Sequence, residues 1–288
     1  MFPKAVDQHK EDRPLIPNGL GVIYVLASAI YLFLLYFLKN DAALPLAGCI
    51  LFGGFMGLID DWMDLRWRFK AFLPIFASLP LAVLRAGNPV MATYILGKID
   101  FSKFHLNGYP VGEIFFYFVV IPIIVTVATN AINQLGGLNG LETVCPSIVM
   151  IGLMVTSTNN ALLFIPLAIN LILAAFNYVG KIFVGNTGSF AIGITLASYA
   201  IIANNEQTLL ISILPYIFNS ALILLNVFLV GKTAHLILKG SKLRSDSKRS
   251  LLTLITYYKP LTERKLVLAV SFLVMFSTFV SIFVWSIW

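Results

Sequence analysis

The succession of long apolar segments constrains this chain more than any other feature. A window of about 19 residues identifies nine of them: 19–38, 42–59, 71–85, 113–129, 141–157, 161–178, 189–203, 208–230 and 266–288. Helices of about 20 residues cross about 30 Å of hydrocarbon with every backbone group satisfied internally. Since 59% of the 288 residues are hydrophobic and only 11% are charged, we predict an all-α polytopic membrane protein. We expect about nine transmembrane helices in a single domain, 1–288.

The positive charges predict how this domain lies in the membrane. If the nine segments cross the membrane one after another, sixteen Lys and Arg residues lie on one side of it. Four lie on the other side, namely Lys39, Arg85, Lys98 and Lys103. Cytoplasmic loops carry the excess of Lys and Arg. The N-terminus and the loops near 60–70, 130–140, 180–188 and 231–265 are therefore predicted to be cytoplasmic.

Four polar clusters fall on that same side. They are "DDWMD" at 60–64, "NAINQLGGLNGLE" at 130–142, "FVGNTGSF" at 183–190 and the basic loop 231–265. Taken singly, each could be a helix end in the headgroup region or a simple turn. Their coincidence predicts a functional site at the cytoplasmic membrane edge. A transporter is disfavoured, because its ionisable residues should lie in mid-bilayer.

The aspartates of the first cluster require a compensating cation. Asp60 and Asp64 share one helix face, and Asp61 lies about 100° round the axis. Mg²⁺, often shared with substrate phosphates, suits carboxylate and amide oxygens. The alternative is neutralisation by the neighbouring cations Arg66, Arg68 and Lys70 as surface ion pairs, which stabilise little.

Glycines mark the second and third clusters. Gly136, Gly137 and Gly140 allow the backbone to approach a ligand, and a helix that starts after them can direct N–H groups at an anion. Asn130 and Asn133 precede them. Glu142 is either a favourable carboxylate at a helix N-terminus or a ligand-orienting group.

The loop from Gly231 to Lys265 carries nine Lys or Arg residues against Asp246 and Glu263, together with His235. Such a loop either attracts anionic lipid or clamps a diphosphate. Nucleic acid is a poor partner, because no soluble module presents a binding surface. Cys49 and Cys145 lie in separate apolar segments and are expected to be core residues.

Together these motifs resemble one known family. "DQHK", "PLIPNGLGVI", "DDWMDLRWRFKAFLPIFASLPL", "NAINQLGGLNGLE", "FVGNTGSF" and "KPLTERKLVL" are similar to segments of the polyprenyl-phosphate N-acetylhexosamine-1-phosphate transferases. The chain particularly resembles the eukaryotic and archaeal branch that makes dolichyl-diphospho-N-acetylglucosamine. The cell-wall branch typically has DG-x-DG where this chain has "GGLNG", and it has a run of histidines where this chain has only His235.

The resemblance implies roles for individual residues. Asp60 and Asp61 would be catalytic, orienting or deprotonating the lipid phosphate, and Asn133 and Asn186 would ligate Mg²⁺, with Mn²⁺ as the alternative. The implied substrate residues are Lys70 for phosphate, Asn139 for uracil, His235 and Lys239 for diphosphate and sugar, and Asp64 and Glu142 elsewhere in the site.

The activity implied is transfer of N-acetylglucosamine 1-phosphate from UDP-N-acetylglucosamine to a polyprenyl or dolichyl phosphate, with release of UMP. Another UDP-N-acetylhexosamine is an alternative substrate. The lipid bilayer is an implied partner, and a homodimer is one option for assembly. The membrane would be the plasma membrane in a prokaryote or archaeon and the endoplasmic reticulum in a eukaryote.

Two departures from the family pattern bear on these expectations. Asn186 stands where the family usually has a metal-binding Asp, which favours weaker metal binding or a catalytically impaired homologue acting as a partner subunit. Family members have ten spans and begin with a helix before the "DQHK"-like loop, whereas nine segments are counted here; either that helix is dispensable in this protein or the start of the sequence has been placed too late.

Overall fold

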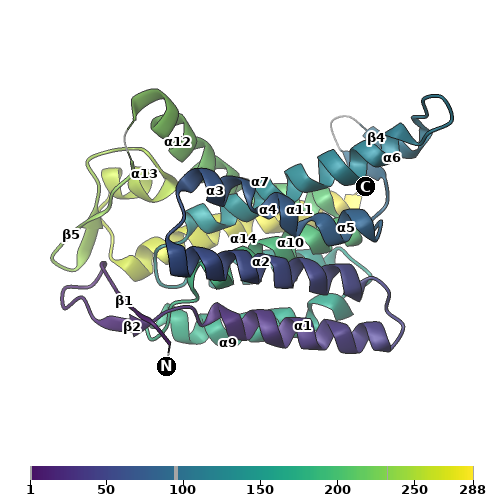
Figure 1. Ribbon diagram of the computed structural model, residues 1–288. Coiled ribbons are helices and arrows are strands. Elements are labelled where there is room, and N and C mark those ends of the chain that lie inside the picture. The colour runs from purple at the N-terminus through teal and green to yellow at the C-terminus, as the bar shows by residue number, and fades with distance from the viewer. Residues whose placement is uncertain (1, 94–96, 232, 288) are drawn as a thin grey trace.

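The structure is a computed structural model that describes residues 2–93, 97–231 and 233–287. Lys232 of the basic loop and Trp288, the end of the last predicted apolar segment, lie outside these ranges. The protein is a helical bundle with three short β-hairpins (Figure 1). The longer helices are α1 (Gly21–Phe37), α2 (Ala43–Met63), α7 (Ile121–Leu135), α8 (Val144–Val155), α9 (Ala161–Tyr178), α10 (Gly185–Ile202), α12 (Leu214–Val230) and α14 (Glu263–Ile287).

The other elements are shorter. The short helices are α3 (Trp67–Phe72), α4 (Pro74–Ala77), α5 (Leu79–Val83), α6 (Val111–Phe115), α11 (Glu206–Ser212) and α13 (Leu251–Tyr258). The hairpins pair β1 (Lys4–Val6) with β2 (Leu15–Pro17), β3 (Val90–Thr93) with β4 (Gly97–Asp100), and β5 (Ile237–Lys239) with β6 (Lys242–Arg244). The β1–β2 hairpin, β5 and α13 lie at one end, whereas β4 and α6 lie at the other (Figure 1).

Helix α10 forms the centre of the bundle. Every residue from Thr187 to Ile201 is buried, as expected for a helix that is apolar on all sides. It approaches α2 closely, since a Cβ built on Gly57 would lie 2.3 Å from the carbonyl oxygen of Asn186. Glycine at position 57 therefore lets the end of α2 touch the start of α10.

Prolines break two of the predicted apolar segments. The predicted segment 71–85 is divided among α3, α4 and α5, with Pro74 and Pro80 in the first turns of α4 and α5. The predicted segment 208–230 is divided into α11 and α12, which meet at 62°, and Pro215 lies in the first turn of α12. A proline has no N–H to donate and clashes with the preceding turn, so each helix restarts at the proline.

Four helical stretches in the described ranges are long and apolar enough to cross a membrane. They are Ala43–Met63, Val111–Leu135, Ala161–Tyr178 and Glu263–Ile287, and the bent pair α11 and α12 would make a fifth. The apolar helices α1 and α8 are shorter. The count of nine spans stays a prediction. Cys49 and Cys145 are free and buried, as expected of core residues.

The contact between α2 and α10 leads to a stability prediction. Gly57→Ala should destabilise the fold by about 1–3 kcal/mol, because the added methyl group meets backbone atoms of α10 that cannot move aside. Gly48→Ala, in the same helix, is the control, because its Cβ would meet only the ring of Pro80 at 3.0 Å. Thermal unfolding in detergent should show a clearly larger loss for Gly57→Ala. Equal losses would contradict the role of this contact.

Candidate active site

Asp61 connects the end of α2 to the start of α10. Its carboxylate accepts hydrogen bonds from the N–H of Asn186 at 2.8 Å, the N–H of Thr187 at 2.9 Å and the hydroxyl of Thr187 at 2.7 Å. Gly185, at φ +71°, opens the helix, and a Cβ there would lie 2.7 Å from Asp61 Oδ2. Because the first N–H groups of a helix have no partner within it and attract negative charge, Asp61 serves as the cap of α10.

Asp60 lies beside Asp61 but faces a different partner. Lys70 Nζ is 2.9 Å from Asp60 Oδ1, which also accepts the N–H of Leu65 at 3.0 Å. The residue is only 2% exposed, and its second oxygen, Oδ2, is buried without a hydrogen-bond partner. Burying a carboxylate oxygen without a partner costs free energy of folding unless a hydrogen-bond donor or a cation binds it.

Asp64 is the outer member of the trio. It ends α2 in the left-handed region at φ 45°, and its side chain is fully exposed, 3.5 Å from Lys70 Nζ. Lys70 therefore contacts two of the three aspartates, and Asp60 is the closer of the two. Arg68 instead stacks over the ring of Trp67, at 5.7 Å from its centre.

Asn133 and Asn186 are in direct contact. The side-chain nitrogen of Asn133, at the end of α7, donates to Asn186 Oδ1 at 3.2 Å and to Ser189 Oγ at 2.7 Å. In the described part of the chain, Asn133 Oδ1 has no protein partner. This amide oxygen is available to a ligand beside the start of α10.

The glycine loop after α7 folds over Glu142. Glu142 Oε1 accepts the N–H of Gly137 at 3.2 Å, and a Cβ on Gly136 would lie 2.4 Å from that oxygen. Burial raises the pKa of Glu142 to about 7; the hydrogen bond from Gly137 lowers it, and the negative charge of Asp61 raises it further. The hydrogen bond found for the Glu142 carboxylate is with the glycine loop and not with the first turn of α8. A ligand-orienting role for Glu142 stays a prediction.

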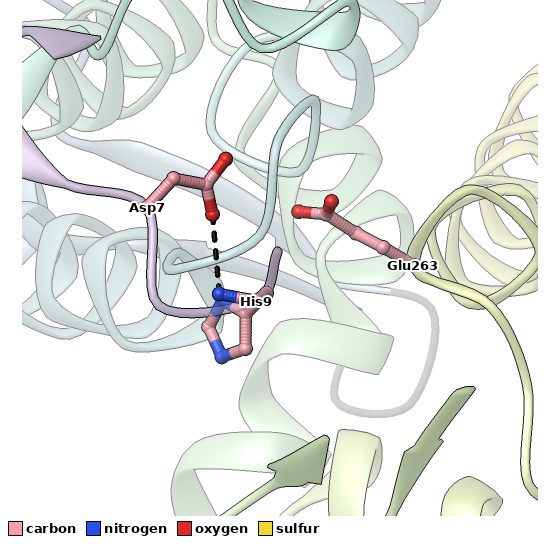
Figure 2. A group of neighbouring side chains, drawn as sticks. All are labelled: Asp7, His9 and Glu263. Carbon is pink, nitrogen blue, oxygen red and sulfur yellow. Dashed lines mark hydrogen bonds between the residues drawn. The ribbon is translucent and has the colours of Figure 1, made fainter. Parts of the chain in front are cut away.

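Asn139 lies in a separate cluster with residues of the N-terminal hairpin and the start of α14. Its side-chain nitrogen donates to Asp7 Oδ2 at 2.8 Å and to Glu263 Oε1 at 2.9 Å. Burial alone would raise the pKa of Asp7, but hydrogen bonds from Asn139, Lys10 and the His9 N–H bring the pKa below its usual value. Figure 2 shows the Asp7 and Glu263 carboxylates facing each other near His9.

Two adjoining cavities lie between these clusters. One of about 270 Å³ is lined by His235 together with Gly136 and Gly137, and the other, of about 300 Å³, by Glu142 and Phe183. Gln8, His9, Gly137 and Leu138 line both. His235 is exposed, with its Nε2 2.7 Å from the hydroxyl of Thr233. Lys239 is exposed on β5, at the same end of the bundle.

The structure thus brings the predicted site residues to one end of the bundle as two groups. Asp60, Asp61, Asp64, Lys70, Asn133 and Asn186 form one linked group, and Glu142 is close enough to feel the charge of Asp61. His235 lines one of the neighbouring cavities, and Asn139 follows Leu138, which lines both.

Sequence reasoning missed several residues that hold this site. Asp7 belongs to "DQHK" and Glu263 to "KPLTERKLVL", but neither had an assigned role. Thr187 and Ser189 belong to the third cluster, "FVGNTGSF". Asn177 is buried near the end of α9, where it accepts the N–H of Gly140 at 2.8 Å and donates to the carbonyl of Ile182 at 2.9 Å. Its signal was an amide in an apolar segment, which it shares with Asn170; such a buried polar group usually marks a functional or structural bond.

The sequence pattern of glycosyl transferase family 4 matches residues 43–204, more than half of the chain. This range contains α2 to α10 and therefore the linked group around Asp61. The chain belongs to glycosyl transferase family 4.

Its relatives in this family come from several lineages. A Saccharolobus solfataricus protein, provisionally named UDP-N-acetylglucosamine–dolichyl-phosphate N-acetylglucosaminephosphotransferase, is 32% identical over 73% of this chain. A Dictyostelium discoideum protein with that name, given without reservation, is 32% identical over 57% of this chain and 47% of its own length. A Streptococcus pyogenes phospho-N-acetylmuramoyl-pentapeptide-transferase is 28% identical over 77% of this chain and 69% of its own length. The chain spans 66% of the length of the Saccharolobus protein.

The capping role of Asp61 can be tested by stability. Asp61→Ala should cost about 1–3 kcal/mol, because it leaves the first N–H groups of α10 unpaired inside the protein. Asp41→Ala, which removes an exposed aspartate before the other end of α2, is the matched control and should be nearly neutral. Thermal unfolding in detergent measures both, and equal stability of the two variants would rule out the cap.

The raised pKa of Glu142 predicts a pH dependence of stability. The folded protein holds this proton more tightly than the unfolded chain does, so the stabilisation is complete below about pH 4.5 and is lost as the pH rises to about 7. Glu142→Gln stays neutral and should flatten the dependence of the melting temperature on pH in this range. Glu113→Gln, which makes the same change in α6, should leave the wild-type dependence intact.

Proposed function

We propose that this protein transfers N-acetylglucosamine 1-phosphate from UDP-N-acetylglucosamine to a polyprenyl phosphate of the dolichyl type, releasing UMP. In this reaction an oxygen of the lipid phosphate forms a bond to the β-phosphorus of the nucleotide sugar. The bond from that phosphorus to the bridging oxygen breaks, and UMP leaves with the oxygen. The relatives named for this activity support the substrate pair.

The observation that carries the proposal is the contact of Asp61, Asn186 and Asn133 beside the Asp60–Lys70 pair. These residues come from α2, α3, α7 and α10, and they collect carboxylates, amides and a lysine at one end of a hydrophobic bundle. Phosphoryl transfer consists mainly of holding two phosphorylated groups in line and neutralising their charge. A site of this composition can do both where a lipid headgroup meets a soluble nucleotide.

The donor set fits Mg²⁺, with Mn²⁺ as the alternative. Asp60 Oδ2 is buried without a hydrogen-bond partner, and no hydrogen bond to Asn133 Oδ1 is found among the described residues. Both are oxygen ligands of the type that Mg²⁺ selects. Asn133 and Asn186 would ligate the ion, and the Asp60 carboxylate would supply a negative charge beside it. The bound ion would neutralise negative charge on the diphosphate.

The other predicted residues have separate tasks in this proposal. Lys70 holds Asp60 in place and faces the phosphate of the lipid, and exposed Asp64 lies at the membrane edge beside it. Asn139, Glu142 and the cavities of about 300 and 270 Å³ receive the nucleotide sugar. His235 and Lys239 contribute to binding of the diphosphate and sugar from the basic loop.

We further propose that the site faces the cytoplasm and that nine segments cross the membrane. In support, the excess of Lys and Arg falls at the end of the bundle that carries the site, and the long apolar helices extend away from that end. The host membrane would be the plasma membrane of a prokaryote or archaeon or the endoplasmic reticulum of a eukaryote, and a homodimer is one option.

The activity is tested with membranes that contain the expressed protein. Added UDP-N-acetylglucosamine, polyprenyl phosphate and Mg²⁺ should yield UMP and a lipid-linked sugar diphosphate, and EDTA should abolish the yield. Competing UDP-N-acetylhexosamines decide which sugar is used. If no UMP forms while an active family member turns over in parallel, the proposal is wrong.

Asn186 favours a second candidate, a catalytically impaired homologue that serves as a partner subunit. The amide keeps an oxygen ligand but lacks the charge of a carboxylate, so the metal should bind more weakly. Asn186→Asp should lower the Mg²⁺ concentration needed for half-maximal turnover by about tenfold or more, on the order of 1.4 kcal/mol. Ser189→Ala, which removes the second partner of Asn133 and a 3.4 Å hydrogen bond to the Asn186 carbonyl but leaves the Asn186 side chain unchanged, should not. Turnover that appears only in Asn186→Asp would favour the impaired homologue.

A further inference from the structure

Three distant parts of the chain meet on the side chain of Asn139. Asp7 follows β1, Asn139 lies in the loop after α7, and Glu263 is the first residue of α14. The Asn139 side-chain nitrogen bridges Asp7 Oδ2 at 2.8 Å and Glu263 Oε1 at 2.9 Å, and the backbone N–H of Asn139 donates to the same Glu263 oxygen at 2.9 Å. A single amide therefore ties the N-terminal hairpin to the start of the last helix.

This cluster is a hydrogen-bonded clamp rather than a metal site. Asp7, His9 and Glu263 offer ligand atoms within 4.8 Å of one another (Figure 2). However, the nitrogen of Asn139 already bridges the two carboxylates, and Lys10 Nζ lies 3.1 Å from Asp7 Oδ2. A cation would have to displace these donors.

Burial makes the clamp strong and directional. Asp7 is 2% exposed and Asn139 is 5% exposed. Hydrogen bonds to a carboxylate are stronger than neutral ones, and more so when water is excluded. Turning the amide over would place its oxygen against two carboxylates, so the orientation of Asn139 is fixed.

The clamped residues and their neighbours line one cavity. Asp7, Gln8 and His9 from the N-terminal hairpin line the cavity of about 300 Å³ together with Gly137 and Leu138, which precede Asn139. Glu263 is not among the residues that line this cavity. The clamp therefore holds these two lining segments together through Glu263, which does not itself line the cavity.

We propose that Glu263, acting through Asn139 and Asp7, is a positioning residue for the nucleotide sugar. The inference rests on the proposed function, which assigns this cavity to UDP-N-acetylglucosamine. Without the Glu263 carboxylate, Asn139 loses two hydrogen bonds, and the Gly137–Leu138 segment can move relative to Gln8 and His9. Binding of the nucleotide sugar then weakens, while the reacting groups around Asp61 and binding of the lipid are unaffected.

The kinetic test compares two substitutions at one position. Glu263→Ala removes the acceptor and should raise the KM for UDP-N-acetylglucosamine about tenfold, with kcat and the KM for polyprenyl phosphate nearly unchanged. Glu263→Gln keeps an Oε1 acceptor in place and should stay close to wild type. Glu113→Ala removes a first-turn carboxylate of α6 at the opposite end of the bundle and serves as the matched control.

Hydrogen–deuterium exchange tests the clamp independently of activity. In Glu263→Ala, amides of residues 4–17 should exchange faster than in wild type, Glu263→Gln and Glu113→Ala, all as monodisperse protein in detergent. The proposal is overturned if Glu263→Ala matches Glu113→Ala in exchange and in KM, if both substrates lose affinity equally, or if Glu263→Gln behaves as Glu263→Ala. If the wild type releases no UMP, the proposed function fails, and the exchange comparison still decides whether the clamp exists.

Discussion

The bond between Asp61 and the first turn of α10 is the constraint on which the site depends. Helix α10 is buried along almost its whole length, so its N-terminal N–H groups need a partner within the protein. Asp61 supplies it from α2, with glycines at 57 and 185 leaving room for the approach. Because Asn186, Thr187 and Ser189 follow directly, the same bond that closes the bundle also places the amides of the site.

Buried amides hold the rest of this end together. Asn177 fixes the glycine loop against α9, and Asn139 joins that loop to the N-terminal hairpin and to the start of α14. Asn219, within α12, accepts the N–H of Leu251 at 2.9 Å and so attaches α13 to the bundle. An amide donates and accepts without carrying charge, so it can tie loops together inside an apolar bundle where a carboxylate would need a counterion.

Three acidic side chains around the proposed phosphate site interact with other groups of the protein. Asp61 accepts hydrogen bonds from the first turn of α10, and Asp60 forms an ion pair with Lys70. Burial, together with the charge of Asp61, raises the pKa of Glu142. Asn186 adds no negative charge beside them. The site therefore has fewer free carboxylates than its sequence suggests, and a metal bound there would depend on Asp60 and on the substrate phosphates for compensation.

The sequence by itself determined the apolar segments, the excess of positive charge on one side and the four polar clusters, because periodicity and composition are local properties of the chain. It also predicted that Asp60, Asp61, Asn133 and Asn186 would lie together. Only the tertiary structure decided that Asp61 caps a helix, that prolines divide the segments 71–85 and 208–230, and that Asn139 joins Asp7 to Glu263. These bonds connect residues more than 100 positions apart, and their geometry follows from how the helices pack, which no local pattern encodes.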